Sequence, residues 1–416
     1  MRPISVTTYT PTTSVTVHTR NGDEYDVTGD LISWQTSKAI TSGQPTGTFT
    51  VNLVARSDTA GSWADKIRPM DYVEIRASKT GAQTPLPIIM RGFVTSSEQA
   101  LQFDVSGGPQ RQVTLTGQDF GKILTNWQIL YLWQIHAVQS LYAALGYGLS
   151  GNFGIDATDS TPTKFFGQSM SHIIEPAVAR LQKINPAVPD LGLVVSIPER
   201  YQMPVVAVES YTGSYWNLLQ TFASPPFGEL FVFDDADGPK LVARMAPYHT
   251  LAGDYPPPGQ PPMLEPAIIP AQDISAYDLE RSDQDALSFF FTYSDAASLT
   301  GTSAASYVLP GGERNPVYYP ATADLYGLRQ EINDTPWVTM ADVGNPYSGS
   351  QATAIAGELN SWLAAVMKDN PEFLSGTIDC HGDPDLIVGR YVQIVIARDK
   401  WTDMITENAT RDMRQQ

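Results

Sequence analysis

The stretch Val113–Gln128, "VTLTGQDFGKILTNWQ", contains the change of pattern that decides the fold. It begins with alternating apolar and polar residues, as in a half-buried β-strand. After Asp119 the apolar residues follow a helical spacing and form one stripe: Phe120, Ile123, Leu124 and Trp127. The sequence therefore predicts a strand that leads into a helix, with Gly117 to Gly121 as a hinge between two domains and Phe120 buried.

The same stretch places Gly121-Lys122 at the start of a helix, as in a phosphate-binding loop. That motif requires Gly, four residues, and then Gly-Lys-Ser/Thr. Here Gly117 is one residue too close to Gly121, and Ile123 replaces the hydroxyl residue that would hold magnesium. The sequence thus argues against a nucleotide site and predicts that Lys122→Ala has little effect.

Composition limits the possible functions further. The 416 residues include 44 acidic and 26 basic ones, a net charge of -18, and such a surface repels DNA and anionic membranes. The single cysteine, Cys380, excludes a disulfide within the chain and fits folding in a reducing cytoplasm. The first residues contain no apolar segment, so no signal peptide is expected.

Between Lys122 and Asp156 the sequence contains no acidic or basic residue except His136. Polar residues interrupt the apolar runs, so no segment approaches the roughly 18 apolar residues that a membrane helix needs. The region is predicted to be a buried helical layer, an oligomer interface or both, because an interface core also excludes charge. The candidate interface residues are Trp127, Tyr131 and Trp133.

The predicted fold class is mainly β with α. Short alternating segments between Val15 and Thr116 indicate an antiparallel β-barrel or sandwich of about 100 residues. A helix is expected over Tyr215–Phe222, capped by Ser214. A β-hairpin should follow it, with the apolar runs Leu230–Phe233 and Leu241–Ala243 on either side of an Asp/Gly turn. Residues 246–270 are rich in proline and are predicted to be a loop, and residues 351–367 to be a helix.

No group of residues predicts catalysis, a cofactor or a metal. The five histidines show no metal-ligand spacing. Cys380 and His381 are neighbours on a predicted strand and point to opposite faces, which argues against a nucleophile and base. "FDDADG" resembles a calcium loop, but Phe233 and Arg244 stand where the loop needs oxygen ligands. A hairpin turn explains its aspartates better.

Several elements follow one another in a characteristic order. They are a barrel closing with "VTLTGQDFGKIL", a helical layer, a helix and hairpin in "YWNLLQTFASPPFGELFVFDDADGPKLVARMAPY", the segment "ISAYDLERSDQDALSFFFTY", and a late strand pair in "GDPDLIVGRYVQI". In this order, from about Val15 to Ile396, the chain resembles the baseplate hub (tail hub) protein of tailed bacteriophages and contractile injection systems.

The resemblance implies a structural protein that forms a trimeric ring at the tip of the tail tube. Two similar β-barrels in each subunit would let six barrels match the hexameric tube, while the threefold side receives the spike. A weak sequence similarity between "RPMDYVEIRA" and "IVGRYVQIVIA" fits two such barrels. The implied domains are a first barrel at 1–118, a helical layer and α/β domain at 119–270, a second barrel from 271–300 and 370–400, an insertion with a helix at 301–369, and a C-terminal tail at 401–416.

The implied partners are two further copies of the chain, a tail tube or distal tail protein, and a spike or tail-tip protein. Genomic DNA would pass through the channel without specific binding, which suits an acidic wall that repels phosphates. The expected location is the virion tail, after assembly in the bacterial cytoplasm, with no membrane anchor and no cofactor.

An alternative is a β-rich hydrolase or a carbohydrate-binding protein that acts on bacterial cell-wall or capsular sugar. A hydrolase needs two carboxylates that face a cleft lined by aromatic residues. Nothing in the sequence singles out two of its 44 acidic residues, and Trp127 and Trp133 lie in the uncharged layer.

Overall fold

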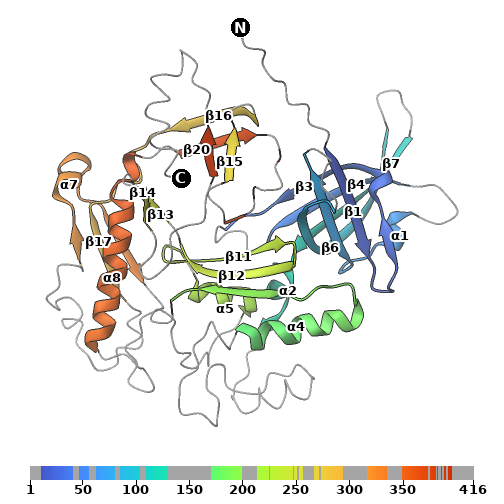
Figure 1. The fold of residues 1–416 in the computed structure, drawn as a ribbon, viewed down its shortest axis with the longest axis horizontal. Coiled ribbons are helices and arrows are strands. Elements are labelled where there is room, and N and C mark those ends of the chain that lie inside the picture. Colours follow the sequence, from blue (N-terminus) through green and yellow to red (C-terminus); the bar gives the residue numbers. More distant parts are fainter. Residues whose placement is uncertain are drawn as a thin grey trace, which may run out of the picture.

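The computed structural model describes most of the chain: residues 11–40, 46–55, 62–79, 85–103, 109–129, 170–198, 213–223, 225–246, 248–250, 253–255, 267–270, 273–293, 316–334, 349–372, 375–380, 382, 386, 388–389 and 392–395. In Figure 1 the N-terminal sheet lies at one end of the long axis. A helix and hairpin unit occupies the centre, with small C-terminal strands above it, and the C-terminal helices lie at the other end.

The N-terminal sheet has seven antiparallel strands in the order β2-β1-β5-β6-β7-β4-β3. Its strands are β1 (Thr12–His18), β2 (Glu24–Asp26), β3 (Leu31–Ser37), β4 (Thr48–Val54), β5 (Tyr72–Ser78), β6 (Ile88–Phe103) and β7 (Pro109–Asp119). A 3-10 turn at Thr28–Asp30 and the short helix α1 (Trp63–Lys66) connect them. This confirms that residues 15–116 form an antiparallel β domain.

The alternation of residues decides which face of this sheet is buried. The residues that the alternation places inward are fully buried in one core at nine positions: Val15, Val17, Phe49, Val51, Leu53, Val73, Ile75, Val113 and Leu115. Ala77, which the same alternation places inward, is only half-buried. The sheet curls until Trp34 on β3 donates a hydrogen bond to the Thr13 hydroxyl on β1, over 3.3 Å. No ladder joins β3 to β1 or β2 in the described strands, so the domain is a curled half-barrel with β2 and β3 as its edges.

The predicted hinge at Gly117–Gly121 is wrong at its first residue. Strand β7 continues through Gly117 to Asp119, and helix α2 (Gly121–Asn126) begins two residues later. A Cβ atom on Gly117 would lie 2.0 Å from Cζ of Phe49 and 2.6 Å from the carbonyl oxygen of Phe93. Gly117 is therefore required by close packing within the sheet, because the Phe49 ring occupies the space of a side chain.

The central unit contains the predicted helix and hairpin. Its elements are α2, β8 (Gln128–Ile129), α4 (Met170–Ile184), β9 (Gly192–Ser196), β10 (Gly213–Ser214), α5 (Tyr215–Phe222), β11 (Gly228–Asp235) and β12 (Gly238–Met245). The Ser214 hydroxyl accepts a hydrogen bond from the Asn217 amide, which confirms the predicted cap. Strands β11 and β12 are antiparallel and turn between Asp235 and Gly238, and β9 extends this sheet in parallel with β12.

The C-terminal part consists of helices and several small sheets. Its elements are β13 (Tyr248–Thr250), β14 (Gly253–Tyr255), β15 (Ala267–Pro270), β16 (Ile274–Glu280), β17 (Phe289–Tyr293), β18 (Val317–Tyr318), α7 (Pro320–Tyr326), β19 (Gln330–Asp334), α8 (Gly349–Met367), a 3-10 turn (Asn370–Glu372), β20 (Ser375–Cys380) and β21 (Val392–Val395). The predicted loop at 246–270 thus contains three short strands, whereas the predicted helix at 351–367 is confirmed as α8.

The described C-terminal strands pair in separate sheets. β15 pairs with β21 in parallel, β16 pairs with β20, and β17 lies between β18 and β19. The two segments of similar sequence, which contain β5 and β21, pair differently. β5 is antiparallel to both its neighbours, whereas β21 is parallel to β15. A second barrel similar to the first stays a prediction.

Candidate assembly surface

Of the three candidate interface residues, only Trp127 lies in the described part of the chain; Tyr131 and Trp133 lie outside it. Trp127 is half-buried and packs against the central core, with its ring centroid 6.1 Å from that of Tyr215. Its carbonyl accepts a hydrogen bond from the Tyr215 amide. Much of this side chain therefore contacts its own subunit, and a role between subunits stays a prediction.

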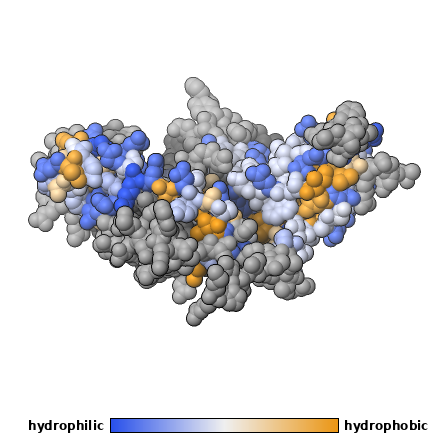
Figure 2. Space-filling model, turned by 90° about the horizontal axis from the view of Figure 1, so that it is seen from above, coloured by the Kyte–Doolittle hydropathy of each residue, from blue (hydrophilic) through white to orange (hydrophobic). Residues whose placement is uncertain are grey.

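The structure points instead to an apolar surface around α7, which the sequence analysis missed. This α7 surface consists of Tyr318, Leu325, Leu328 and Ile332, which are 49%, 72%, 73% and 49% exposed. Helix α7 has no buried residue at all. Figure 2 shows hydrophobic side chains at the end of the molecule where Figure 1 places α7. Four large apolar side chains exposed within residues 318–332 make this region a candidate contact surface.

Two local signals in the sequence could have predicted α7. Pro320 stands at the first helical position, where the missing amide proton costs nothing. Gly327 follows the helix with φ of 87°, and its amide bonds to the Ala323 carbonyl. The helix has no buried stripe, however, so the search for apolar periodicity could not find it.

A buried serine fixes α7 to strand β17. The Ser288 carbonyl accepts a hydrogen bond from the Tyr319 amide just before the helix. The Ser288 hydroxyl lies 3.2 Å from the Gly327 carbonyl and 3.1 Å from the Arg329 amide just after it. The Arg329 carbonyl in turn accepts the amides of Ser288 and Phe289. Both ends of α7 are therefore held in place, although the helix buries no side chain.

Helix α8 is bonded to the same sheet through β17. Its Asn360 side chain is fully buried, donates to the Phe290 carbonyl over 3.2 Å and accepts from the Thr292 hydroxyl over 3.1 Å. The neighbouring Leu359 and Leu363 are buried in the central core. The α7 surface thus belongs to a sheet that is tied to the rest of the subunit.

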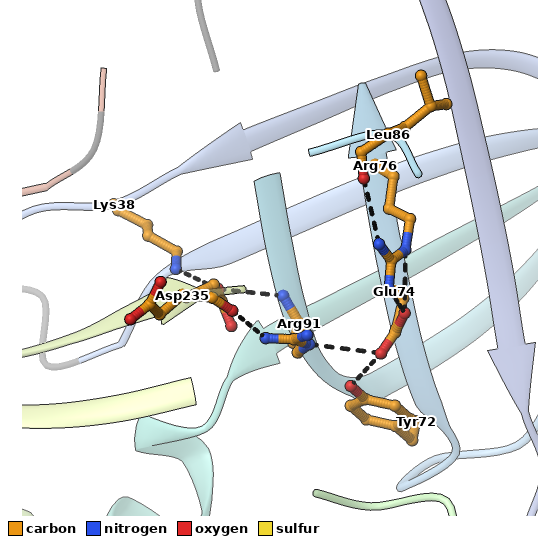
Figure 3. A network of polar contacts seen from close by, with 8 residues as sticks. Lys38, Tyr72, Glu74, Arg76, Leu86, Arg91 and Asp235 are labelled. Carbon is orange, nitrogen blue, oxygen red and sulfur yellow. Dashed lines mark hydrogen bonds and ion pairs between the residues drawn. The ribbon is translucent and has the colours of Figure 1, made fainter. Parts of the chain in front are cut away.

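A buried polar network joins the N-terminal sheet to the central hairpin (Figure 3). Arg91 on β6 donates from Nε to Glu74 over 3.3 Å and from its guanidinium to the Asp235 carbonyl over 2.7 Å. Its backbone amide donates to Asp234, which also pairs with Lys38 at 2.5 Å. Because these residues come from β5, β6, β11 and the end of β3, the network fixes the orientation of the two units.

Glu74 is the shared acceptor of this network. It accepts hydrogen bonds from the Tyr72 hydroxyl, from Arg76 and from Arg91. Burial alone would raise the pKa of Glu74, but these hydrogen bonds and the two arginine charges hold it below its usual value. Alternation with Val73 and Ile75 places Tyr72 on the face of β5 opposite the barrel core, and the central unit buries it there.

Two further contacts reinforce the connection. Lys79, at the end of β5, pairs with the buried Asp273 at 2.8 Å, just before β16. The Asn185 side chain, after α4, donates to the His18 carbonyl over 2.9 Å. The N-terminal sheet is therefore tied to both the central and the C-terminal parts.

Lys122 differs strongly from what its sequence context predicts. Its side chain is buried, and Nζ donates to the Val94 carbonyl over 2.8 Å and to the Thr95 hydroxyl over 3.0 Å. These acceptors lie at the β-bulge of β6, between Val94 and Ser96. Burial lowers the pKa of Lys122 to about 8. The amine is thus committed to the sheet and does not face a phosphate site.

Lys122→Ala is therefore expected to destabilise the fold, contrary to the expectation from the sequence. Losing the buried stem and both hydrogen bonds should cost roughly 1–3 kcal/mol. The folded amine loses its proton near pH 8 and the unfolded one near 10.5, so the wild type should gain stability relative to the variant as pH rises between these values. Chemical denaturation of both proteins at pH 7.5 and 9.5 checks this; equal stability at both values would contradict it.

Asp119 holds the junction of β7 and α2 with both carboxylate oxygens. One accepts the Gly47 amide over 2.8 Å and the other accepts the Gly121 amide over 2.9 Å. Burial raises the pKa of Asp119 to about 7, against the opposing effects of Lys38 and of the two backbone amides. The folded protein therefore binds this proton more tightly than the unfolded chain does.

This raised pKa predicts a dependence of stability on pH. Below pH 3.8 Asp119 is protonated in both the folded and the unfolded chain. Between pH 3.8 and about 7 the unfolded chain has lost this proton while the folded chain still binds it, so the free energy of unfolding falls as pH rises. Stability should therefore fall from pH 5 to 7 by up to about 1.4 kcal/mol per pH unit. Asp119→Asn should lose one amide bond at every pH but remove this slope, as measured by chemical denaturation. If the variant's stability still fell between pH 5 and 7 as in the wild type, a group other than Asp119 would cause the pH dependence.

The described residues contain no group of three His, Cys, Asp or Glu that could hold a metal. Asp234 and Asp235 of the calcium-like stretch pair with Lys38 and Lys240 instead. Cys380 ends β20 half-buried, while His381 falls outside the described residues. Within the part of the chain that the structure describes, no helix is long and apolar enough to span a membrane.

Comparisons with known proteins reach only solved structures. No protein-family model and no curated protein matches the chain. The tail protein from Neisseria meningitidis MC58 is 12% identical with a TM-score of 0.41, over 92% of this chain and 86% of that one. The 43 kDa tail protein of prophage MuSo2 from Shewanella oneidensis is 12% identical with a TM-score of 0.44, over 95% and 90%. At this distance the likeness carries no conclusion about function.

Proposed function

We propose that this chain is a structural protein of a phage tail, the hub that forms a trimeric ring at the tip of the tail tube. The observation that carries the proposal is the order of its elements. A curled antiparallel half-barrel leads through β7 into α2, and the α5, β11 and β12 unit and strand β16 follow in the order that the hub resemblance requires. The two tail proteins described above agree with this proposal but are too distant to support it.

The surfaces of the chain suit assembly better than catalysis. The α7 surface is apolar, exposed and held from both ends, as a contact surface between subunits should be. Several of the buried or half-buried acids in the described segments belong to ion pairs: Glu74, Asp234, Glu229 and Asp273. No observation favours the alternative of a hydrolase or carbohydrate-binding protein.

In the proposed ring the chain would adapt the sixfold tube to the threefold spike and line the DNA channel. Its partners would be two further copies, a tail tube or distal tail protein, and a spike or tail-tip protein. The net charge of -18 suits a channel wall, because negative side chains repel phosphates and let DNA slide. The protein would be part of the virion tail after assembly in the host cytoplasm.

Deleting the coding sequence from the phage genome that carries it tests the proposed function. Lysates should then contain filled heads without completed tails in negative-stain electron microscopy, and the chain supplied from a plasmid should restore tailed particles. A matched control is deletion of an unrelated gene of similar length. Normal tails that still eject DNA in the absence of the chain would overturn the proposal.

A further inference from the structure

The net charge of the chain is distributed very unevenly. Residues 1–118 contain ten basic and ten acidic residues, whereas residues 119–416 contain 16 basic and 34 acidic ones. The whole charge of -18 therefore belongs to the part that follows the N-terminal sheet. Two acidic surfaces repel each other at close range, so a contact between copies is favoured where an acidic region meets the neutral one.

The α7 surface lies on the acidic side of this division. Two acidic residues belong to this region: Asp324 on the helix is exposed, and Glu331 on β19 is half-buried. The nearby Arg329 is already occupied, because its guanidinium contacts the Asp283 side chain and the carbonyls of Asp283 and Gln284. A contact of this surface with itself would bring these acids together, which disfavours a symmetric pair.

The opposite end of the molecule offers the complementary features. In Figure 1 the N-terminal sheet and α7 lie at the two ends of the long axis. Leu101 on β6 is 56% exposed and pairs across the ladder with Arg111 on β7, which is exposed and forms no ion pair within the described residues. Leu101 with the neighbouring Arg111 is therefore complementary to the α7 surface, which combines exposed apolar residues with acidic ones.

We propose that the α7 surface of one copy packs against the N-terminal sheet of a second copy at Leu101 and Arg111. The contact is head to tail, because it joins different surfaces at opposite ends of an elongated subunit. Head-to-tail contacts build closed rings when the rotation between copies closes. The inference rests on the proposed function, since it identifies the subunit contact of the hub ring.

Sedimentation velocity with the full chain tests this contact. One variant, Leu325→Gln with Leu328→Gln, removes the α7 surface, and a second, Leu101→Gln with Arg111→Glu, removes the acceptor. The wild type should form trimers, and each variant alone should be monomeric. Ile184→Gln, at an exposed apolar residue of α4, is the matched control and should remain trimeric. Far-ultraviolet circular dichroism spectra should be the same for all four proteins, which shows that each variant is folded.

Mixing the two variants gives the decisive result. Each retains the surface that the other lacks, so an equimolar mixture should form dimers joined by one intact contact. The inference is overturned if either variant alone stays trimeric, if the mixture stays monomeric, or if the wild type is monomeric at the highest soluble concentration. A wild-type trimer that both variants leave intact would overturn the contact alone, whereas normal tails after gene deletion would overturn the hub function.

Discussion

Replacing Phe120 by alanine is expected to lower the free energy of unfolding by roughly 3–5 kcal/mol. Phe120 is fully buried where β7 ends and α2 begins, with its ring centroid 5.0 Å from that of Phe93 and 6.1 Å from that of Tyr72. These rings belong to the core that the sheet shares with the central unit. The substitution therefore leaves a cavity between the two units that neither can close alone. Chemical denaturation followed by circular dichroism measures the loss.

Tyr277→Ala is the control for this substitution. Tyr277 is an aromatic residue of β16 whose side chain is 45% exposed, so its removal should change stability by no more than about 0.5 kcal/mol. A Phe120 variant that loses less than the control would show that the sheet and the central unit do not share a core.

Arg91→Met is expected to have a comparable effect, with a loss of about 3 kcal/mol or more. The methionine fills most of the volume but removes the donors to Glu74 and to the Asp235 carbonyl. The half-buried carboxylate of Glu74 and the carbonyl of Asp235 then lose a partner inside the connection, which costs more than an exposed ion pair contributes. Amide hydrogen exchange should also become faster on both sides of the connection, in β5 and in β11.

Arg68→Met provides the matched control, because Arg68 is an exposed arginine of the same sheet domain with no ion pair among the described residues. It should leave both stability and hydrogen exchange near the wild-type values. If the Arg91 variant behaved in the same way, the apolar core alone would hold the two units together.

Local patterns predicted the elements whose cause is local. Alternating residues such as Val15 and Val17 located the strands of the half-barrel. The Ser214 cap located α5, and the turn between Asp235 and Gly238 located the hairpin. In each case a few neighbouring residues determine the structure through their own hydrogen bonds or one buried face.

Features that depend on distant contacts could not be predicted in the same way. Lys122 is buried because a bulge nearly thirty residues earlier in the chain presents Val94 and Thr95 to its amine. Tyr72 lies on the face of β5 opposite Val73 and Ile75, and it is buried because the central unit covers it. Helix α7 has no buried residue and its Leu325 is exposed, so it lacks the apolar stripe from which a helix is predicted. A sequence pattern records which residues alternate, but not which later segment covers them.

The molar mass of the purified chain, measured by size-exclusion chromatography with multi-angle light scattering, tests the central claim most directly. The hub assignment predicts three times the mass of one chain, because a closed threefold ring built from head-to-tail contacts has no free surface for a fourth copy. A stable dimer, or a closed ring with a copy number other than three or six, would contradict the assignment.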